Sequence, residues 1–204
     1  MAACDELTAT AERLGAVNCI FWRDGKIVGD STDGDGYVRG LHADLGLSVT
    51  GLRCVIVGAG GAAGAVAYAL GVGGAEQVAV VNRTEAKAQA VASLAANKGK
   101  VGSVGDLVDA DLVINATPIG MGSTELANDM PFDVGAVRPD AVVSDLIYHP
   151  AQTPLLVAAA ERGMRTQNGL PMLVHQAVAA FEHWTTIKAP VEVMTAAVQA
   201  NLGA

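Results

Sequence analysis

The small residues at positions 58–64 are spaced as in turns that bind dinucleotide phosphates. Gly58, Gly60 and Ala63 fit the pattern G-x-G-x-x-G/A, between an apolar strand at 54–57 and a helix. The first glycine permits a tight turn, the second lets the backbone approach a pyrophosphate, and the third small residue packs helix against strand. Free N–H groups at the helix start then face the phosphates. We interpret this stretch as a cofactor site formed by Gly58, Ala59, Gly60, Gly61 and Ala62. The alternative is a glycine-rich turn without a ligand.

The residues after the next apolar strand, at 77–81, bear on which dinucleotide is bound. This strand ends in Asn82, Arg83 and Thr84, without the acid that usually holds the ribose 2′-hydroxyl of NAD. A guanidinium at this place can hold a 2′-phosphate with two hydrogen bonds, and Asn82 and Thr84 can add donors. The sequence therefore favours NADP(H). In the alternative reading, Arg83 is a solvated loop residue and Thr84 only a helix cap. Glu85 leaves some use of NAD open.

Hydrophobic runs and turn residues predict the elements that carry these side chains. Helices are expected at 5–14 (with Asp5 as a possible cap), 37–46, 61–70, 84–96, 154–162, 170–184 and 191–202, and a polar loop at 31–36. Strands are expected at 17–22, 26–29, 54–57, 77–81, 111–115, 141–145 and 165–167, with Asp24-Gly25 as a type I′ hairpin turn. The alternation from residue 54 onward predicts an α/β fold, a Rossmann-type doubly wound parallel sheet.

The most natural domain boundary lies near residue 50, before the regular alternation of strands and helices begins. The part before residue 50 is too short to bury a core by itself.

Composition excludes several classes of function. The chain has 13 Lys and Arg against 21 Asp and Glu, a net charge of −8, which argues against a nucleic-acid or anionic-membrane partner. Cys4, Cys19 and Cys54 have no metal-binding spacing, so no metal is predicted and the thiols are expected to be reduced. No signal peptide and no membrane-spanning apolar run is recognised. We expect a cytoplasmic protein with a small-molecule substrate.

Several ordered motifs resemble the shikimate dehydrogenases. They are GAGGAA at the glycine turn, NRT after the next strand, INATPIGM at 114–121, and segments at 15–18, 32–34, 145–156 and 168–176. The resemblance covers essentially the whole chain. It implies that residues 1–48 form a small remnant of a second, substrate-binding domain with a linker helix, and that residues 49–185 form the NADP-binding Rossmann domain. Residues 186–204 would form a C-terminal helix that packs back toward the substrate domain. For activity, the resemblance implies a reversible NADP-dependent reduction of 3-dehydroshikimate to shikimate, in which hydride passes between the nicotinamide and the ring carbonyl carbon.

The resemblance also implies roles for single residues. Asp33 matches the aspartate of a catalytic Lys–Asp pair, which can supply and orient the proton for the developing alkoxide. Asn18 and Gln176 match residues that hold substrate hydroxyls, and Tyr148 matches one near the substrate. On the cofactor side, the matching residues are Asn115, Ala116, Thr117, Gly169 and Met172.

The sequence departs from the family pattern in ways that bear on activity. Ser31, Cys19 and Pro171 replace usual residues, and no lysine stands in the family's Pro-x-Lys context. The paired-serine motif and the substrate-binding half that precede residue 15 in the family are also missing. An expressed fragment, a misplaced start codon and a natural short homologue are three possible explanations. We expect NADP(H) binding with weak or no turnover.

Two alternative functions and the oligomeric state stay open. The chain could be a relative that acts on quinate or aminoshikimate, or a non-catalytic NADP-binding module. Apolar faces of the first hairpin and the last helix could support a homodimer.

Overall fold

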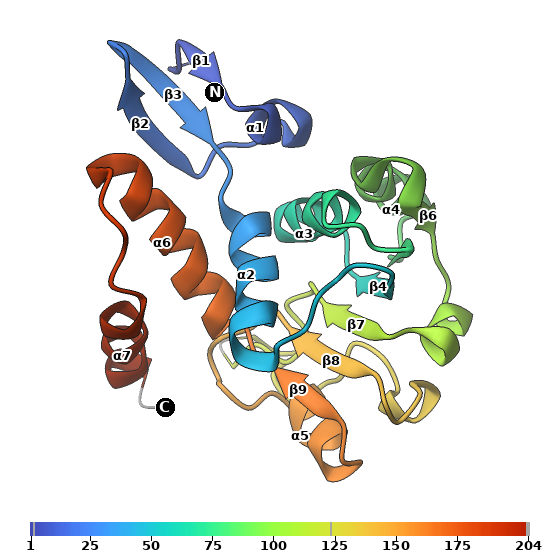
Figure 1. Cartoon of the computed structure of the whole chain (residues 1–204). Helices are drawn as coiled ribbons and strands as arrows, with labels where there is room; N and C mark the ends of the chain where they lie inside the picture. The colour runs from blue at the N-terminus through green and yellow to red at the C-terminus, as the bar shows by residue number, and fades with distance from the viewer. Residues whose placement is uncertain (2, 123, 203–204) are drawn as a thin grey trace.

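The computed structural model describes residues 1, 3–122 and 124–202, which form two sheets joined by a central helix (Figure 1). The larger sheet contains β4 (Arg53–Val57), β5 (Gln77–Val81), β6 (Gly99–Val101), β7 (Leu112–Asn115), β8 (Val142–Asp145) and β9 (Arg165–Gln167). Its order is β6-β5-β4-β7-β8-β9 and all neighbouring strands are parallel. The chain builds outward from β4 to β6 and then returns to the other side of β4, so the predicted doubly wound sheet is confirmed.

Alternation along the strands decides which face each side chain covers. In β4, Cys54 and Ile56 belong to one buried cluster while Val55 belongs to the other. The first cluster is closed by α2 (Asp33–Leu45), α3 (Gly61–Val72) and α4 (Glu85–Ala92), and the second by α5 (Pro154–Glu161) with the 3₁₀ turns η2 (Val104–Asp109) and η3 (Val134–Ala136). Burial on both faces explains why these strands are continuously apolar.

The smaller sheet has the order β1-β3-β2, from β1 (Glu6–Leu7), β2 (Cys19–Arg23) and β3 (Lys26–Asp30). The predicted hairpin is confirmed, because Asp24 (φ 52°) and Gly25 (φ 78°) have the left-handed backbone of a type I′ turn. The predicted helix at 5–14 is wrong in its first half. The Asp5 carboxylate accepts a hydrogen bond from Ile27 N (2.8 Å) and so joins β1 to β3, and Thr8 caps the shorter α1 (Ala9–Leu14).

Helix α2 lies between α3 and α6 (Leu170–Thr185) at the centre of the molecule (Figure 1). It begins at Asp33, so the predicted loop at 31–36 and the predicted start at residue 37 are wrong. Glycines suggested a loop, but here they let helices touch. A Cβ on Gly34 would lie 2.4 Å from Ala65 O on α3, and one on Gly36 would lie 2.5 Å from Gln176 N on α6. Close packing therefore overrides the helix cost of glycine, about 1 kcal/mol each.

The predicted helix at 84–96 is also shorter than expected. Helix α4 ends at Ala92 and continues as the 3₁₀ segment η1 (Ser93–Lys98), in which Ala96 has a non-helical backbone (φ 54°). This bend returns the chain to pair β6 with β5. Thr84 stands at the N-cap position of α4, but its side chain makes no capping bond. The last helix, α7 (Val191–Leu202), packs on α6. None of the described helices is both long and apolar enough to span a membrane.

Candidate functional site

A cavity of about 540 Å³ lies beside the start of α3, and Ala90 and Val91 of α4 and Leu94 of η1 also line it. Helix α3 follows the carboxyl end of β4, where the chain order of the sheet reverses. This is the place at which open parallel sheets bind their ligands. One wall consists of the glycine turn and the start of α3, and the facing wall consists of residues before and within the hairpin and at the start of α2. The lining includes Gly60, Gly61 and Ala62 on one side and Asn18, Ser31 and Asp33 on the other. Two groups predicted separately, one for cofactor and one for substrate, thus share one cavity.

The glycine turn has the backbone that phosphate binding requires. Gly58 has φ 115°, and a Cβ there would lie 2.6 Å from Ala116 O, so only glycine fits between the ends of β4 and β7. Gly60 is the N-cap of α3, and a Cβ on Gly60 or Gly61 would meet no atom within 4 Å. The first N–H groups of an α-helix have no acceptor within the helix. At α3 they border an open cavity and can bind an anion.

The side chains after β5 lie beside this turn, because Val81 pairs with Val57 in the parallel ladder. The Asn82 side-chain amide donates to Thr84 O (3.0 Å), which fixes the chain between β5 and α4. Arg83 and Thr84 are both exposed. This end of β5 therefore presents a guanidinium and a hydroxyl next to the anion-binding turn.

On the opposite wall, Asn18 connects the hairpin to the start of α2. Its Nδ2 donates to Asp33 Oδ1 (2.7 Å) and Thr32 Oγ1 (3.1 Å), and its Oδ1 accepts from Thr32 N (2.9 Å). Burial raises the pKa of the Asp33 carboxyl, and the hydrogen bond from Asn18 acts in the opposite direction. Thr32 is buried, with 2% of its surface exposed, and its contact with Asn18 was not anticipated from sequence.

The side chain of Asn115 is fixed by hydrogen bonds to neighbouring residues rather than left free to contact a ligand. Its Nδ2 donates to Asp145 Oδ1 (3.0 Å) and Ile119 O (3.1 Å), and its Oδ1 accepts from Thr117 N (2.9 Å) and Thr117 Oγ1 (2.7 Å). Asp145 also accepts from Thr153 Oγ1 (2.8 Å), and its burial raises the pKa of this carboxyl, against the effect of its three hydrogen bonds. These contacts fix the loop after β7, with Ala116 against Gly58.

Of the predicted site residues, Asn18, Asp33, Gly60, Gly61 and Ala62 line this cavity, whereas residues 82–84, residues 115–117 and the others do not. Gln176 donates through Nε2 to Leu173 O (2.8 Å) on its own helix, and Met172 is half-buried against the core. A Cβ on Gly169 would lie 2.0 Å from Leu146 O, so Gly169 serves a close approach of chains. Tyr148 is 43% exposed in the loop after β8.

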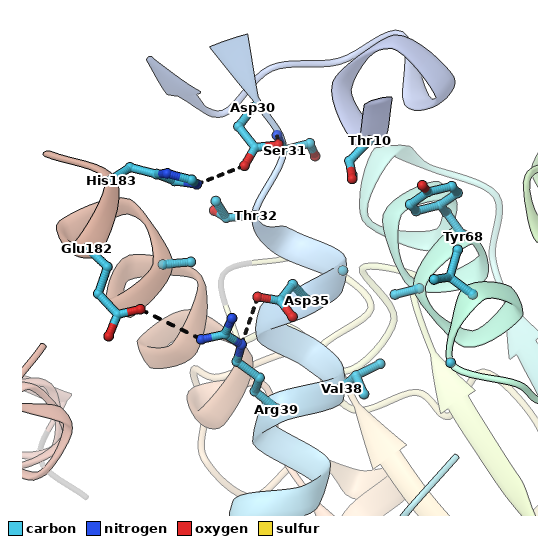
Figure 2. Close-up of a pocket in the computed structure, with 15 residues that line it drawn as sticks. Thr10, Asp30, Ser31, Thr32, Asp35, Val38, Arg39, Tyr68, Glu182 and His183 are labelled. Carbon is cyan, nitrogen blue, oxygen red and sulfur yellow. Dashed lines mark hydrogen bonds and ion pairs between the residues drawn. The ribbon is translucent and has the colours of Figure 1, made fainter. Parts of the chain in front are cut away.

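A second cavity, of about 530 Å³, lies beside α2 and is bordered by the hairpin, α3 and α6 (Figure 2). Its polar lining includes Asp30, Arg39, Tyr68 and His183. Asp30 and His183, which contact each other, were not singled out from sequence, because residues 153 positions apart give no local signal. No cluster of three or more His, Cys, Asp or Glu suited to a metal occurs among the described residues.

When the six strands of the larger sheet are renumbered from β4 in chain order, the sheet has the order 3-2-1-4-5-6. This order, with a glycine turn at the strand where it reverses, defines a Rossmann-type α/β protein. Residues 42–125 match the model of the family described as "Shikimate / quinate 5-dehydrogenase", and residues 169–199 match "Shikimate 5'-dehydrogenase C-terminal domain". The "Shikimate dehydrogenase (NADP(+))" of Methanopyrus kandleri is 42% identical over 99% of this chain and 73% of its own length. The chain belongs to the shikimate dehydrogenase family of oxidoreductases.

Solved structures of similar proteins share the fold. Shikimate 5-dehydrogenase from Thermus thermophilus in complex with NADP(H) and shikimate gives a TM-score of 0.88 at 33% identity, over 98% of this chain and 74% of that one. Ligand-free 5-ketofructose reductase of a Gluconobacter species gives a TM-score of 0.84 at 34% identity, over 97% of this chain and 73% of that one. One fold thus serves more than one substrate among these neighbours.

The raised pKa of Asp33 predicts how Asp33→Asn changes stability with pH. Because the folded state holds this proton more tightly, ionised Asp33 lowers the free energy of unfolding at neutral pH, and the penalty disappears as pH falls through the raised pKa. We expect Asp33→Asn to be more stable than the wild type near neutral pH. The difference should shrink toward about pH 4, near the ordinary aspartate value. Urea unfolding across this range measures it.

The exposed residue Asp24 provides the matched control. The difference between Asp24→Asn and the wild type should change little over the same range. A stability of Asp33→Asn below that of the wild type at neutral pH would contradict the prediction.

Proposed function

We propose that the chain binds NADP(H) at the glycine turn and acts in the interconversion of 3-dehydroshikimate and shikimate. The observation that supports this most is the shared cavity, in which the start of α3 faces Asn18 and Asp33. In this proposal residues 49–185 form the NADP-binding domain, which also contributes Tyr148 and Gln176 to the substrate side. Residues 1–48 are the remnant of the substrate-binding domain, and residues 186–204 are a C-terminal helix that packs back toward it.

The cofactor's phosphates would be held from the end of the sheet. The pyrophosphate lies against the N–H groups of Gly60, Gly61 and Ala62 at the start of α3. Arg83 and Thr84 hold the 2′-phosphate, since both are exposed beside this turn. Asn115 would contribute indirectly, because it accepts two hydrogen bonds from Thr117 and so fixes the loop with Ala116 and Thr117 that would contact the cofactor. Gly169 and Met172 lie toward the nicotinamide in this assignment.

The substrate side would bind a polyhydroxylated ring and manage one proton. Asn18, Gln176 and Tyr148 offer amide and hydroxyl groups to ring hydroxyls. NADPH, when bound, supplies hydride to the carbonyl carbon. The carbonyl oxygen then requires a proton, and Asp33 serves as one half of the acid–base pair that delivers it. Its raised pKa suits a group that exchanges protons, and Asn18 fixes its orientation.

Shikimate oxidation tests how complete this site is. No lysine is found among the described residues that line the cavity with Asp33, so the carboxyl lacks a cationic partner there. General acid–base groups contribute about 10²–10⁴-fold to a rate. We therefore expect NADP(H) binding with turnover reduced by about that factor relative to the Methanopyrus kandleri enzyme, measured from NADPH formation. Comparable rates for the two proteins would contradict this expectation.

Two other functions remain as alternatives. The description of the matching family model names quinate beside shikimate, which favours quinate as a second substrate, and aminoshikimate is a further candidate of the same ring type. The missing lysine in the cavity favours a non-catalytic NADP-binding module. A substrate panel separates them, because a dehydrogenase turns over at least one ring substrate, whereas a module binds NADPH and turns over none.

The 2′-phosphate role of Arg83 predicts a selective loss of NADP binding. Hydrogen bonds to charged groups contribute about 1.5–3 kcal/mol. Arg83→Ala should therefore weaken NADP binding at least about tenfold and leave NAD binding nearly unchanged. Calorimetry with both dinucleotides measures this.

Arg162→Ala is the matched control, because Arg162 is an exposed arginine at the end of α5. It should change neither affinity. Equal losses of NADP and NAD in Arg83→Ala would remove the assigned role.

We also propose a homodimer through the outer side of β2. This strand is the edge of its sheet, and Trp22 (71% exposed), Trp184 (62%) and Ile187 (65%) present apolar surface there. A second copy of the chain would cover this surface.

Trp22→Lys should then shift the protein from dimer to monomer in light scattering. Val108→Lys, at an exposed valine in η2, should not. A wild-type protein that is monomeric at all concentrations would contradict the proposal.

A further inference from the structure

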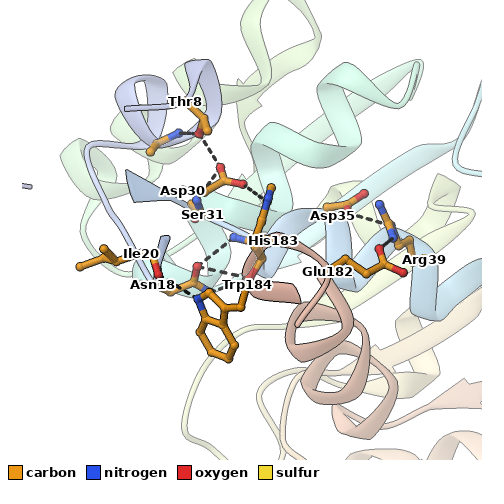
Figure 3. A network of polar contacts seen from close by, with 12 residues as sticks. Thr8, Asn18, Ile20, Asp30, Ser31, Asp35, Arg39, Glu182, His183 and Trp184 are labelled. Carbon is orange, nitrogen blue, oxygen red and sulfur yellow. Dashed lines mark hydrogen bonds and ion pairs between the residues drawn. The ribbon is translucent and has the colours of Figure 1, made fainter. Parts of the chain in front are cut away.

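A contact between His183 and Asp30 ties the end of α6 to the end of β3 (Figure 3). His183 Nε2 lies 2.9 Å from Asp30 Oδ2. The imidazole is also held from the side, because it stacks on the Phe21 ring with centroids 4.2 Å apart and planes 7° apart. Next to it, Trp184 Nε1 donates to Ile20 O (2.8 Å). The orientation of His183 is therefore defined by two different elements of the hairpin.

The Asp30 carboxylate is the other partner in this contact. Its Oδ1 accepts from Ser31 N (2.8 Å), just before α2, and from the hydroxyl of Thr8, which caps α1. Further along the chain, Thr32 N donates to Asn18 Oδ1, and Asn18 Nδ2 donates to Asp33 Oδ1. A continuous series of contacts thus leads from His183 to the carboxyl and amide groups assigned to the substrate.

Helix α6 carries another assigned residue on the same face. Gln176 precedes His183 by seven residues, which is two helical turns and about 10 Å along the axis. At Gln176 the helix touches α2 so closely that a Cβ on Gly36 would lie 2.5 Å from Gln176 N. The two helices also touch near the start of α6, where a Cβ on Gly40 would lie 2.8 Å from Pro171 Cβ. The contact of His183 with Asp30 adds the end of β3 to this pair of helices, and so connects the hairpin to the helix that carries Gln176.

A neighbouring ion pair makes a similar connection less firmly. Arg39 on α2 reaches Asp35 (2.7 Å) and Glu182 on α6 (3.9 Å), as Figure 2 shows. The side chains of Arg39 and Glu182 are 47% and 36% exposed, against 35% for His183 and 15% for Asp30. Exposed ion pairs contribute little to stability. The contact of His183 with Asp30 is the firmer connection, because it is shorter (2.9 Å) and the imidazole also stacks on Phe21.

We propose that His183 and Asp30 are positioning residues that set the placement of Gln176 relative to Asn18 and Asp33, and through it the affinity for the substrate ring. Neither residue touches the reacting atoms. This inference rests on the proposed function for its substrate, but the geometry that it predicts can be observed without any ligand.

The first test compares His183→Leu, His183→Gln and Glu182→Gln by nuclear magnetic resonance of the free protein. The side-chain amide signals of Asn18 and Gln176 report the two ends of the site. His183→Leu should shift or broaden both signals. His183→Gln keeps a donor near the Nε2 position and should restore them. Glu182→Gln removes the charge of the neighbouring ion pair but keeps an oxygen that can accept from Ala189 N, and it should leave both signals unchanged.

The second test titrates shikimate into each NADP-saturated variant. His183→Leu should weaken shikimate binding about three- to tenfold, with unchanged NADP affinity and with recovery in His183→Gln. Unchanged amide signals in folded His183→Leu would overturn the inference, as would equal losses in both His183 variants. A wild-type protein that binds no shikimate would instead refute the proposed substrate, and the amide signals would still decide the positioning role.

Discussion

The contact of α2 with its two neighbouring helices is the constraint on which the rest of the structure depends. Gly34 meets α3, Gly36 meets Gln176, and Gly40 meets Pro171, each at a distance that leaves no room for a Cβ. Because α2 follows directly from the hairpin, this packing also fixes where the small sheet sits. The glycine-lined helix α2 therefore connects the cofactor side to the hairpin side of the cavity, and the contacts of His183 and Trp184 connect α6 to the same hairpin.

The two walls of this cavity use different chemistry. The α3 wall offers backbone N–H groups and open space, which suit an anion. The hairpin wall offers a half-buried carboxyl and an amide, which suit hydroxyl groups and proton exchange. Outside the lining of the cavity, Asn115 bonds to Asp145 and to the loop after β7, which lies against Gly58 of the glycine turn. Charge and hydrogen bonding thus divide the cavity into a phosphate part and a hydroxyl part.

Local patterns predicted most of the fold. The apolar runs of β4, β5, β7 and β8, the glycine turn and the Asp24-Gly25 hairpin depend on short-range chemistry and were confirmed. The start of α2 was missed because Gly34 and Gly36 indicate a loop locally, whereas their role in helix packing depends on α3 and α6. Asp5 was taken for a helix cap because its partner, Ile27, is distant in sequence. The contact of His183 with Asp30 was invisible for the same reason.

The hydrogen bond made by the Trp184 indole limits how the hairpin can pair with other molecules. It donates to the carbonyl of Ile20 in β2, the outer strand of its sheet. A further strand added there would need such carbonyl groups to extend the ladder, and one of them is already occupied by a side chain. Contact through the exposed tryptophans therefore favours a closed pair of molecules over open-ended strand addition, the route by which unprotected sheet edges grow into fibres.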